Sequence, residues 1–203
     1  LVAGIRYDIH NNLGNFFTPR IHMRYQPFEK SVFRFSLGTG RKSSNIFSEN
    51  QNIFATGREI KILNNSGKFY GLDPEKAFNY GLSFRQGFFI NNREGDITFD
   101  YYVTDFDNQV VVDWETQGEL SFYNLDGKSY AKSLQVDIEY QLIDNVLIKS
   151  TFKNFDVKKQ YDSGLKQNPL TPKNRFFTNI EASTNEKENG SKWKFDLTYN
   201  WIG

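Results

Sequence analysis

Apolar and polar residues alternate over long stretches of this chain. Between Trp193 and Trp201 every odd position is apolar and every even position is polar. Residues 129–142 alternate in the opposite phase, with Leu134, Val136 and Ile138 among the apolar even positions. Alternate side chains of a strand point to opposite faces, so one face of each stretch is apolar over its whole length. The other face is too charged for a core, and an apolar outside around a polar inside is typical of a transmembrane β-barrel.

The alternation and the turn signals predict about nine strands. Several exceed the roughly 5–6 residues common in soluble proteins and reach the roughly 9–11 that cross a bilayer at a tilt. The expected strands are residues 1–10, 17–27, 31–41, 76–90, 96–114, 128–142, 145–162, 174–184 and 191–203. The predicted fold class is all-β, an antiparallel up-and-down transmembrane β-barrel. Apolar positions change parity between Val103 and Val110, which predicts a β-bulge at residues 105–109.

The links between these strands alternate in length. Tight turns are expected at residues 26–30, 91–95, 144–145 and 186–190, and longer links at 42–75, 115–127 and 163–173, with a shorter one at 11–16. In an up-and-down barrel this places all tight turns at one end, as in outer-membrane barrels with short periplasmic turns and long extracellular loops. A soluble β-sandwich or lipocalin-like barrel has no reason to sort its links this way. The 42–75 segment is too long for a plain connector, which suggests a functional loop.

Composition excludes several classes of protein. The chain has 203 residues with 25 basic and 24 acidic side chains, so a nucleic-acid binder with a broad basic face is not expected. It contains no cysteine, which excludes disulfides, thiol catalysis and cysteine-bound metals. No phosphate loop, nucleophile elbow or helical metal motif occurs, so we expect no catalytic residue, no metal and no cofactor. Both ends fall within strand-like sequence, which suggests an internal piece of a longer polypeptide.

The two faces of the predicted sheet differ in chemistry. The face expected to meet lipid carries Ile5, Tyr7, Ile21, Met23, Tyr25, Phe33, Phe35, Leu37, Phe78, Tyr80, Leu82, Phe84, Ile97, Phe99 and Val103. The face expected to line the interior carries Arg6, Asp8, Arg20, Arg24, Arg34, Arg85, Asp100, Asp137, Glu139, Lys192, Lys194 and Asp196. A charge at mid-bilayer costs about 2–4 kcal/mol, and Lys132, the exception on the apolar face, is therefore expected near a rim. In a soluble fold the charged face would instead be the solvated exterior.

The first two strands suggest one ion pair and no metal site. Pairing around the 11–16 link would place Asp8 opposite Arg20 inside the barrel. The same register keeps His10 and His22 apart, so the two histidines are not expected to bind a metal together.

Several ordered segments resemble the barrel of TonB-dependent outer-membrane receptors of the Bacteroidota type. They are Thr18-Pro19-Arg20, the glycine-rich strand 33–41, residues 71–77 before the next strand, and residues 99–115. The resemblance covers nearly the whole chain. It implies that residues 1–203 are part of a single barrel domain, about nine strands of a 22-stranded barrel, in the outer membrane of a Gram-negative bacterium. The plug domain and the TonB box of the family lie outside this segment.

The resemblance also implies a transporter and not an enzyme. It would take up a scarce ligand such as a ferric siderophore or cobalamin, energised by TonB. The implied partners are outer-membrane lipid, the protein's own N-terminal plug domain, the TonB complex and a small-molecule or metal-chelate ligand, with no nucleic acid. A plugless porin and a soluble β-sandwich binding module remain as alternatives.

Two sets of residues are candidates for contacts with these partners. Ligand-binding candidates on the long loops are Phe54, Phe69, Tyr70, Phe122 and Tyr123, for which the alternative is packing within their own loop. Candidates that would face the plug are Arg6, Arg20, Arg24, Arg34 and Arg85.

Overall fold

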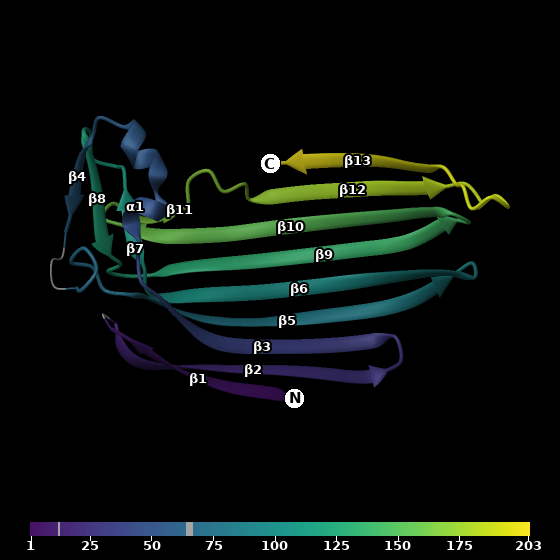
Figure 1. Ribbon diagram of the computed structural model, residues 1–203, viewed down its shortest axis with the longest axis horizontal. Coiled ribbons are helices and arrows are strands. Elements are labelled where there is room, and N and C mark those ends of the chain that lie inside the picture. The colour runs from purple at the N-terminus through teal and green to yellow at the C-terminus, as the bar shows by residue number, and fades with distance from the viewer. Residues whose placement is uncertain (12, 64–66) are drawn as a thin grey trace.

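The computed structural model describes residues 1–11, 13–63 and 67–203, and most of them belong to one antiparallel sheet. Its strands follow the order β1-β2-β3-β5-β6-β9-β10-β12-β13, and β11 pairs with β10. They are β1 (Val2–His10), β2 (Gly14–Phe28), β3 (Ser31–Lys42), β5 (Glu75–Ile90), β6 (Arg93–Asn108), β9 (Ser129–Ile143), β10 (Val146–Tyr161), β11 (Gly164–Gln167), β12 (Asn174–Ser183) and β13 (Lys194–Ile202). Figure 1 shows the long strands side by side in up-and-down order, which confirms the predicted fold class.

A second, smaller sheet is built from the long links. It has the order β4-β8-β7, with β4 (Glu59–Ile62), β7 (Val110–Asp113) and β8 (Glu119–Asn124). Two short helices precede it, α1 (Ile46–Glu49) and η1 (Gln51–Ala55). We call these elements together the loop sheet. Within the described part of the chain, no helix has the length and apolar character needed to cross a membrane.

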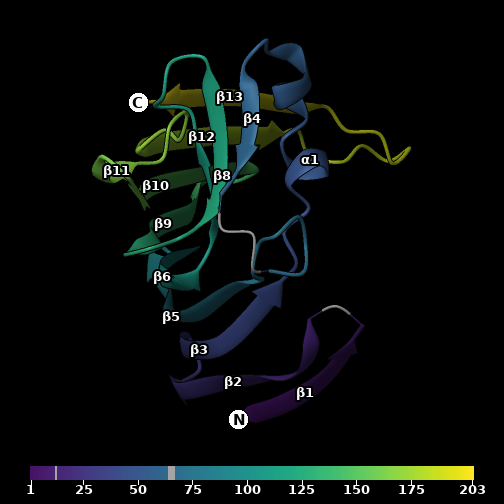
Figure 2. The same ribbon diagram turned by 90° about the vertical axis from the view of Figure 1, so that its left-hand side faces the viewer.

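The main sheet is an open arc. Viewed along its strands in Figure 2, it curves from β1 at one end to β13 at the other, and the loop sheet lies on its concave side. The arc is part of a barrel wall, and it does not close on itself.

The two faces of the arc have the predicted chemistry. No second layer of the described residues covers the large apolar side chains of the outer face. Many of these side chains are exposed; the exposed fraction is 77% for Ile5 and 45% for Trp201, for example. Phe33 and Phe84 stack across β3 and β5 with ring centroids 4.5 Å apart, which shows that the aromatic rows of the outer face pack against one another. Lys132 is the fourth residue of β9, next to the end from which the long loops leave, and its ammonium lies over the Tyr130 ring.

The four predicted tight turns, which join β2 to β3, β5 to β6, β9 to β10 and β12 to β13, lie at one end of the strands. Figure 1 shows this end opposite the loop sheet. The turn between β5 and β6 consists of Asn91 and Asn92, whose φ angles of 52° and 59° fit a type I′ turn, the kind that matches strand twist. Asn145, also at positive φ, turns the chain between β9 and β10. Asparagine tolerates this backbone region, so the local sequence accounts for these turns.

Two boundaries differ from the prediction. The expected strand 96–114 ends at Asn108: a register irregularity at residue 107 agrees with the predicted bulge, but residues 110–113 leave the wall as β7 and join the loop sheet. The expected link 115–127 contains β8. Strand β7 has apolar side chains on both faces because it is covered on both sides. The apolar positions therefore change parity between Val103, which belongs to the wall, and Val110, which belongs to β7.

The register of the first hairpin also differs. The connection is only residues 11–13, so Asp8 lies opposite Phe16, and Arg20 lies opposite Gly4. The predicted ion pair between Asp8 and Arg20 is therefore wrong. Asp8 instead accepts a hydrogen bond from Nε of Arg6 on its own strand, at 2.8 Å.

Candidate ligand-binding loops and lumenal face

The loop sheet has a hydrophobic core of its own. Strand β4, from the link between β3 and β5, pairs in parallel with β8, from the link between β6 and β9. The buried side chains of this core are Ile46, Ile53, Leu72, Val110, Leu120 and Phe122. Both long links contribute to one core, so the two loops form a single packed unit over the concave side of the arc (Figure 2).

Arg58 joins the two loops at the edge of this unit. Its Nη1 donates hydrogen bonds to the backbone carbonyls of Trp114 at 2.8 Å, Thr116 at 3.3 Å and Glu119 at 3.2 Å. Its guanidinium also lies 5.4 Å from the centre of the Trp114 ring. A planar guanidinium presents several donors in a fixed geometry, which suits a side chain that caps carbonyls of a neighbouring loop.

A third loop is tied to this unit by ionic contacts. Glu115 accepts a 2.5 Å hydrogen bond from Nζ of Lys166 on β11 and a short one from the hydroxyl of Ser163. The hydrogen bond from Lys166, followed by that from Ser163, lowers the pKa of the Glu115 carboxyl. The link between β10 and β12 is thereby held to the loop sheet.

The structure places two of the five ligand candidates inside the loops. Phe122 is fully buried in the loop-sheet core, and Tyr123 is 8% exposed beside Val111 and Tyr161. The Tyr123 hydroxyl donates to Oδ2 of Asp113 at 2.8 Å, and burial followed by this contact raises the pKa of the tyrosine. Packing within the loops therefore accounts for both residues, and neither offers surface to a ligand in this conformation.

Two other candidates come together in an exposed cluster. The ring of Phe47 on α1 stacks on Phe54 of η1 at 6.1 Å and meets Tyr70 edge-on at 5.2 Å. Phe54 is 69% exposed and Tyr70 is 45% exposed. We call Phe47, Phe54 and Tyr70 the aromatic cluster. Phe69 is half-buried and lies 6.1 Å from the His10 ring at the end of β1.

Sequence reasoning did not select Phe47, although it lies in the same long link. Its position seven residues before Phe54 predicts no contact, and only the arrangement of α1 and η1 brings the two rings together. Exposed aromatic faces grouped in this way can take a planar or apolar group by stacking, with an advantage of about 0.5–1.5 kcal/mol per ring pair beyond burial of area.

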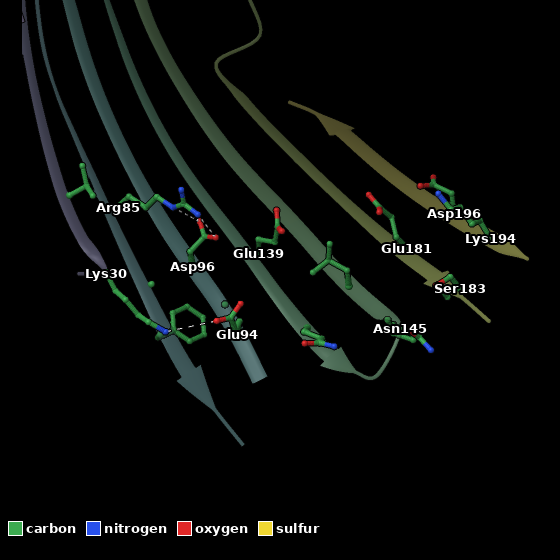
Figure 3. Close-up of a pocket in the computed structure, with 18 of the residues that line it drawn as sticks. Lys30, Arg85, Glu94, Asp96, Glu139, Asn145, Glu181, Ser183, Lys194 and Asp196 are labelled. Atoms are coloured by element: carbon green, nitrogen blue, oxygen red, sulfur yellow. Dashed lines mark hydrogen bonds and ion pairs between the residues drawn. The ribbon is translucent and has the colours of Figure 1, made fainter. Parts of the chain in front are cut away.

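All five candidate arginines lie on the strands of the wall, at positions whose cross-strand neighbours share the charged face. Arg85 makes a two-point contact with Asp96 at 3.2 Å and 3.0 Å, between β5 and β6. Figure 3 shows these two side chains directed at each other on the concave side of the strands. Arg24 donates to Oε1 of Gln26 at 2.6 Å.

The charged face is hollowed near the tight turns. A hollow of about 990 Å³ is lined by basic and acidic side chains from β2 through β13, among them Arg24, Arg85, Glu139, Glu181 and Lys194. Several of them project into it in Figure 3. The open arc bounds this space on one side only, so its charged lining faces the interior of the barrel that the arc would form.

The two histidines do not share a site. His10 pairs with Gly14 in the register, and His22 pairs with Val2 at the other end of β1. Within the described residues, no group of three or more His, Asp or Glu side chains is arranged to hold a metal ion.

An antiparallel up-and-down wall with an apolar outside, a charged inside and long loops at one end defines an outer-membrane-type β-barrel. The family model described as "TonB dependent receptor-like, beta-barrel" matches residues 1–203, and the chain belongs to this family.

Solved structures of receptors share the fold of this chain. Two mutants of the ferric enterobactin receptor PfeA from Pseudomonas aeruginosa have TM-scores of 0.64 and 0.62 at 12% identity. They are matched over 99% of this chain and over 29% and 30% of theirs. PfeA in complex with BCV-L6 has a TM-score of 0.57 at 12% identity, over 97% of this chain and 34% of that one. The chain thus spans about a third of these receptors, and identity this low shows likeness of fold alone. No curated protein matches the chain.

Proposed function

We propose that this chain is part of the barrel of an outer-membrane receptor that takes up a scarce ligand with energy from TonB. The observation that carries the proposal is the arc itself, whose outer aromatic and aliphatic rows suit lipid while its inner rows are charged. Family membership adds the expectation of a TonB-linked transporter rather than an enzyme. The partners would be outer-membrane lipid, an N-terminal plug domain of the same polypeptide, the TonB complex and the ligand.

The ligand class proposed first is a ferric siderophore. The similar solved structures carry the name of a ferric enterobactin receptor. Capture would begin at the aromatic cluster, with Phe54 and Tyr70 as direct contacts. Phe69, which lies beside His10, is proposed as a further contact. The cluster is exposed, it is held by a packed core, and it lies on the loop side of the barrel.

The interior would be filled by the plug. Mixed charges at this density pair readily with a protein surface, and Arg6, Arg20, Arg24, Arg34 and Arg85 are the side chains proposed to face it. A plugless porin would share both faces of the wall. The two functions differ in conductance: a receptor closed by a plug passes little current in a planar bilayer, and a porin is open.

The test of uptake uses a strain that lacks the full-length gene. Complementation should restore growth on limiting iron supplied as a ferric siderophore, and limiting cobalamin should have no effect. Restoration on cobalamin alone would replace the proposed ligand, and restoration on neither, with a large open-pore conductance, would favour the porin.

The test of the ligand site uses substitutions in the aromatic cluster. Phe54→Ala and Tyr70→Ala should each weaken ligand binding about three- to tenfold, the loss that corresponds to about 0.7–1.4 kcal/mol. Leu170→Ala is the control, since Leu170 is fully exposed on another loop. Equal affinity in all three variants would remove the cluster from the site.

A further inference from the structure

A tyrosine at the tip of a tight hairpin, in the link between β3 and β5, has an uncommon backbone conformation. Phe69 and Leu72 form an antiparallel bridge, and the amide of Leu72 donates to the carbonyl of Phe69 at 2.8 Å. The two residues between them, Tyr70 and Gly71, have φ angles of 53° and 79°, which fit a type I′ turn. Asparagine, aspartate and glycine are the usual residues in such a turn, and a bulky side chain is an outlier there. We call these four residues the Tyr70 hairpin.

The conformation of Tyr70 is held from outside the turn. A backbone outlier of this kind persists only where the surrounding structure fixes it, and such outliers cluster at functional sites. Leu72 fixes one side of the turn, because its side chain is 1% exposed in the loop-sheet core. The Tyr70 ring gains little burial in return, since it stays 45% exposed and meets only the edge of the aromatic cluster at Phe47. Packing of this ring therefore does not account for a tyrosine at the tip.

A side chain of β8 fixes the other side of the turn. Asn124, the last residue of β8, accepts a hydrogen bond from the backbone amide of Asp73 at 2.8 Å. Its Nδ2 donates to the carbonyl of the same residue at 3.0 Å. The side-chain amide of Asn124 thus pairs with the backbone of Asp73 as a neighbouring strand would. Asp73 follows the Tyr70 hairpin directly, so this pairing sets the direction in which the chain leaves the turn.

The same asparagine is joined to the barrel wall. Nδ2 of Asn124 also donates to Oδ1 of Asn108, the last residue of β6, at 3.2 Å. Nδ2 of Asn108 donates in turn to the carbonyl of Pro74 at 3.0 Å. These two side-chain amides connect the segment after the Tyr70 hairpin to the end of a wall strand. The hairpin is therefore tied to the wall as well as to the loop sheet.

We propose that Asn124 is a positioning residue of the ligand site, which holds the Tyr70 hairpin so that the Tyr70 ring is in place before a ligand arrives. This inference rests on the proposed function, because it takes the aromatic cluster as the ligand site. Asn124 acts through Tyr70 and does not itself contact the ligand. A contact that is held in place beforehand loses less conformational freedom on binding, which strengthens the affinity.

The experiment measures the affinity of full-length receptor variants for ferric enterobactin, the ligand in the name of the similar solved receptors. Asn124→Ala should weaken binding about threefold or more, but by no more than Tyr70→Ala does, because it acts through that ring. In a Tyr70→Ala background, Asn124→Ala should change the affinity less than about twofold. A general loosening of the loop sheet would instead weaken binding in both backgrounds, because it would also displace Phe54.

Asn79→Ala is the matched control. Nδ2 of Asn79, on β5, donates to the carbonyl of Val103 at 3.2 Å and to the hydroxyl of Thr104 at 2.7 Å, both on β6. The substitution thus removes a similar set of hydrogen bonds from the wall and leaves the Tyr70 hairpin untouched. The affinity for ferric enterobactin should change less than about twofold.

Hydrogen exchange without ligand separates this inference from the proposed function. In Asn124→Ala the amide of Leu72 should exchange about tenfold faster, as expected for the loss of two hydrogen bonds next to the turn, while exchange in β4 stays unchanged. Failure of ferric enterobactin to bind the wild type would contradict the proposed function, and it is told apart by this exchange, which needs no ligand.

Three outcomes would overturn the inference. The first is equal affinity of Asn124→Ala and the wild type for ferric enterobactin. The second is the same loss of affinity from Asn124→Ala with and without the Tyr70 ring. The third is unchanged exchange at Leu72 in Asn124→Ala, which would show that the hairpin does not depend on this asparagine.

Discussion

The ring of Tyr102 on β6 occupies the position that a β-carbon of Gly81 on β5 would take. The two residues are cross-strand partners, and an ideal β-carbon on Gly81 would lie 2.1 Å from Cδ1 of Tyr102. The tyrosine thus lies flat on the lumenal face of its neighbour strand. Glycine at position 81 is needed for this close approach of a ring to the backbone.

Gly81→Ala should therefore destabilise the wall. The added methyl group forces the Tyr102 ring out of place, and overpacking of this kind costs about 1–3 kcal/mol. The measurement is the free energy of unfolding of the full-length receptor in urea and detergent. Gly40→Ala is the control, because a β-carbon there meets nothing within 4 Å, and it should leave stability unchanged or slightly raised. Equal effects of the two substitutions would refute the packing argument.

Arg58→Ala should loosen the loop sheet without unfolding the wall. Three carbonyls lose a charged donor, and hydrogen bonds to charged groups contribute about 1.5–3 kcal/mol. We expect faster amide exchange in β4 and β8 and unchanged exchange in β9. Arg58→Lys keeps the charge but not the planar set of donors, so its amide exchange rates in β4 and β8 should lie between those of Arg58→Ala and those of the wild type. Exchange in β4 that does not respond to either substitution would contradict this role.

The contact between Glu115 and Lys166 should weaken in acid. The pKa of Glu115 is lowered in the folded protein from its ordinary value of 4.5, so its contribution to stability is present above that value. It is lost as the pH falls through the lowered pKa. A spin-label distance between the β7–β8 link and β11 should therefore broaden as the pH falls below 4.5 and through the lowered pKa. Glu115→Gln should give the broad distribution at every pH, and a wild-type distance that stays narrow in acid would be inconsistent with the linkage.

A charge on the outer face should be far more damaging than one on the inner face. Val136 lies between Phe99 and Phe152 on the outer side of β9, whereas its neighbour Gln135 faces Asp100 across the inner side. Val136→Arg should cost about 2–4 kcal/mol of folding stability in a bilayer. Gln135→Arg should change it by less than about 1 kcal/mol, since acidic neighbours and water accommodate the charge. The folding stability of both variants in lipid vesicles shows which face meets the membrane. A larger loss in Gln135→Arg than in Val136→Arg would contradict the assignment of the apolar face to lipid.

The sequence was sufficient to predict the strands of the wall. All nine expected strands form, and apart from the fifth they end within three residues of the prediction. Alternation is a local property of the chain, and it fixes which side chains share a face wherever the chain is extended. Turn residues are local as well, as the positive φ angles of Asn91 and Asn92 show.

The loops depended on contacts between distant segments. Phe122 and Tyr123 were chosen as exposed aromatics. Strand β8 pairs with β4, about 60 residues earlier in the chain, and Phe122 is buried in the core that this pairing forms. Tyr123 is buried against Val111 and Tyr161, which also come from other segments. The same long-range packing presents Phe47 together with Phe54 and Tyr70. Periodicity carries no information about which loop meets which.

The arginines show the same division between sequence and structure. Alternation placed Arg6, Arg20, Arg24, Arg34 and Arg85 on one face, and the strands bear this out. Only the register between strands decided that Arg85 meets Asp96, that Asp8 does not meet Arg20, and that Arg24 stands opposite Arg34. A strand's own sequence sets the direction of its side chains, but cross-strand neighbours depend on the length of each connection, and a difference of a few residues in a loop changes every pair.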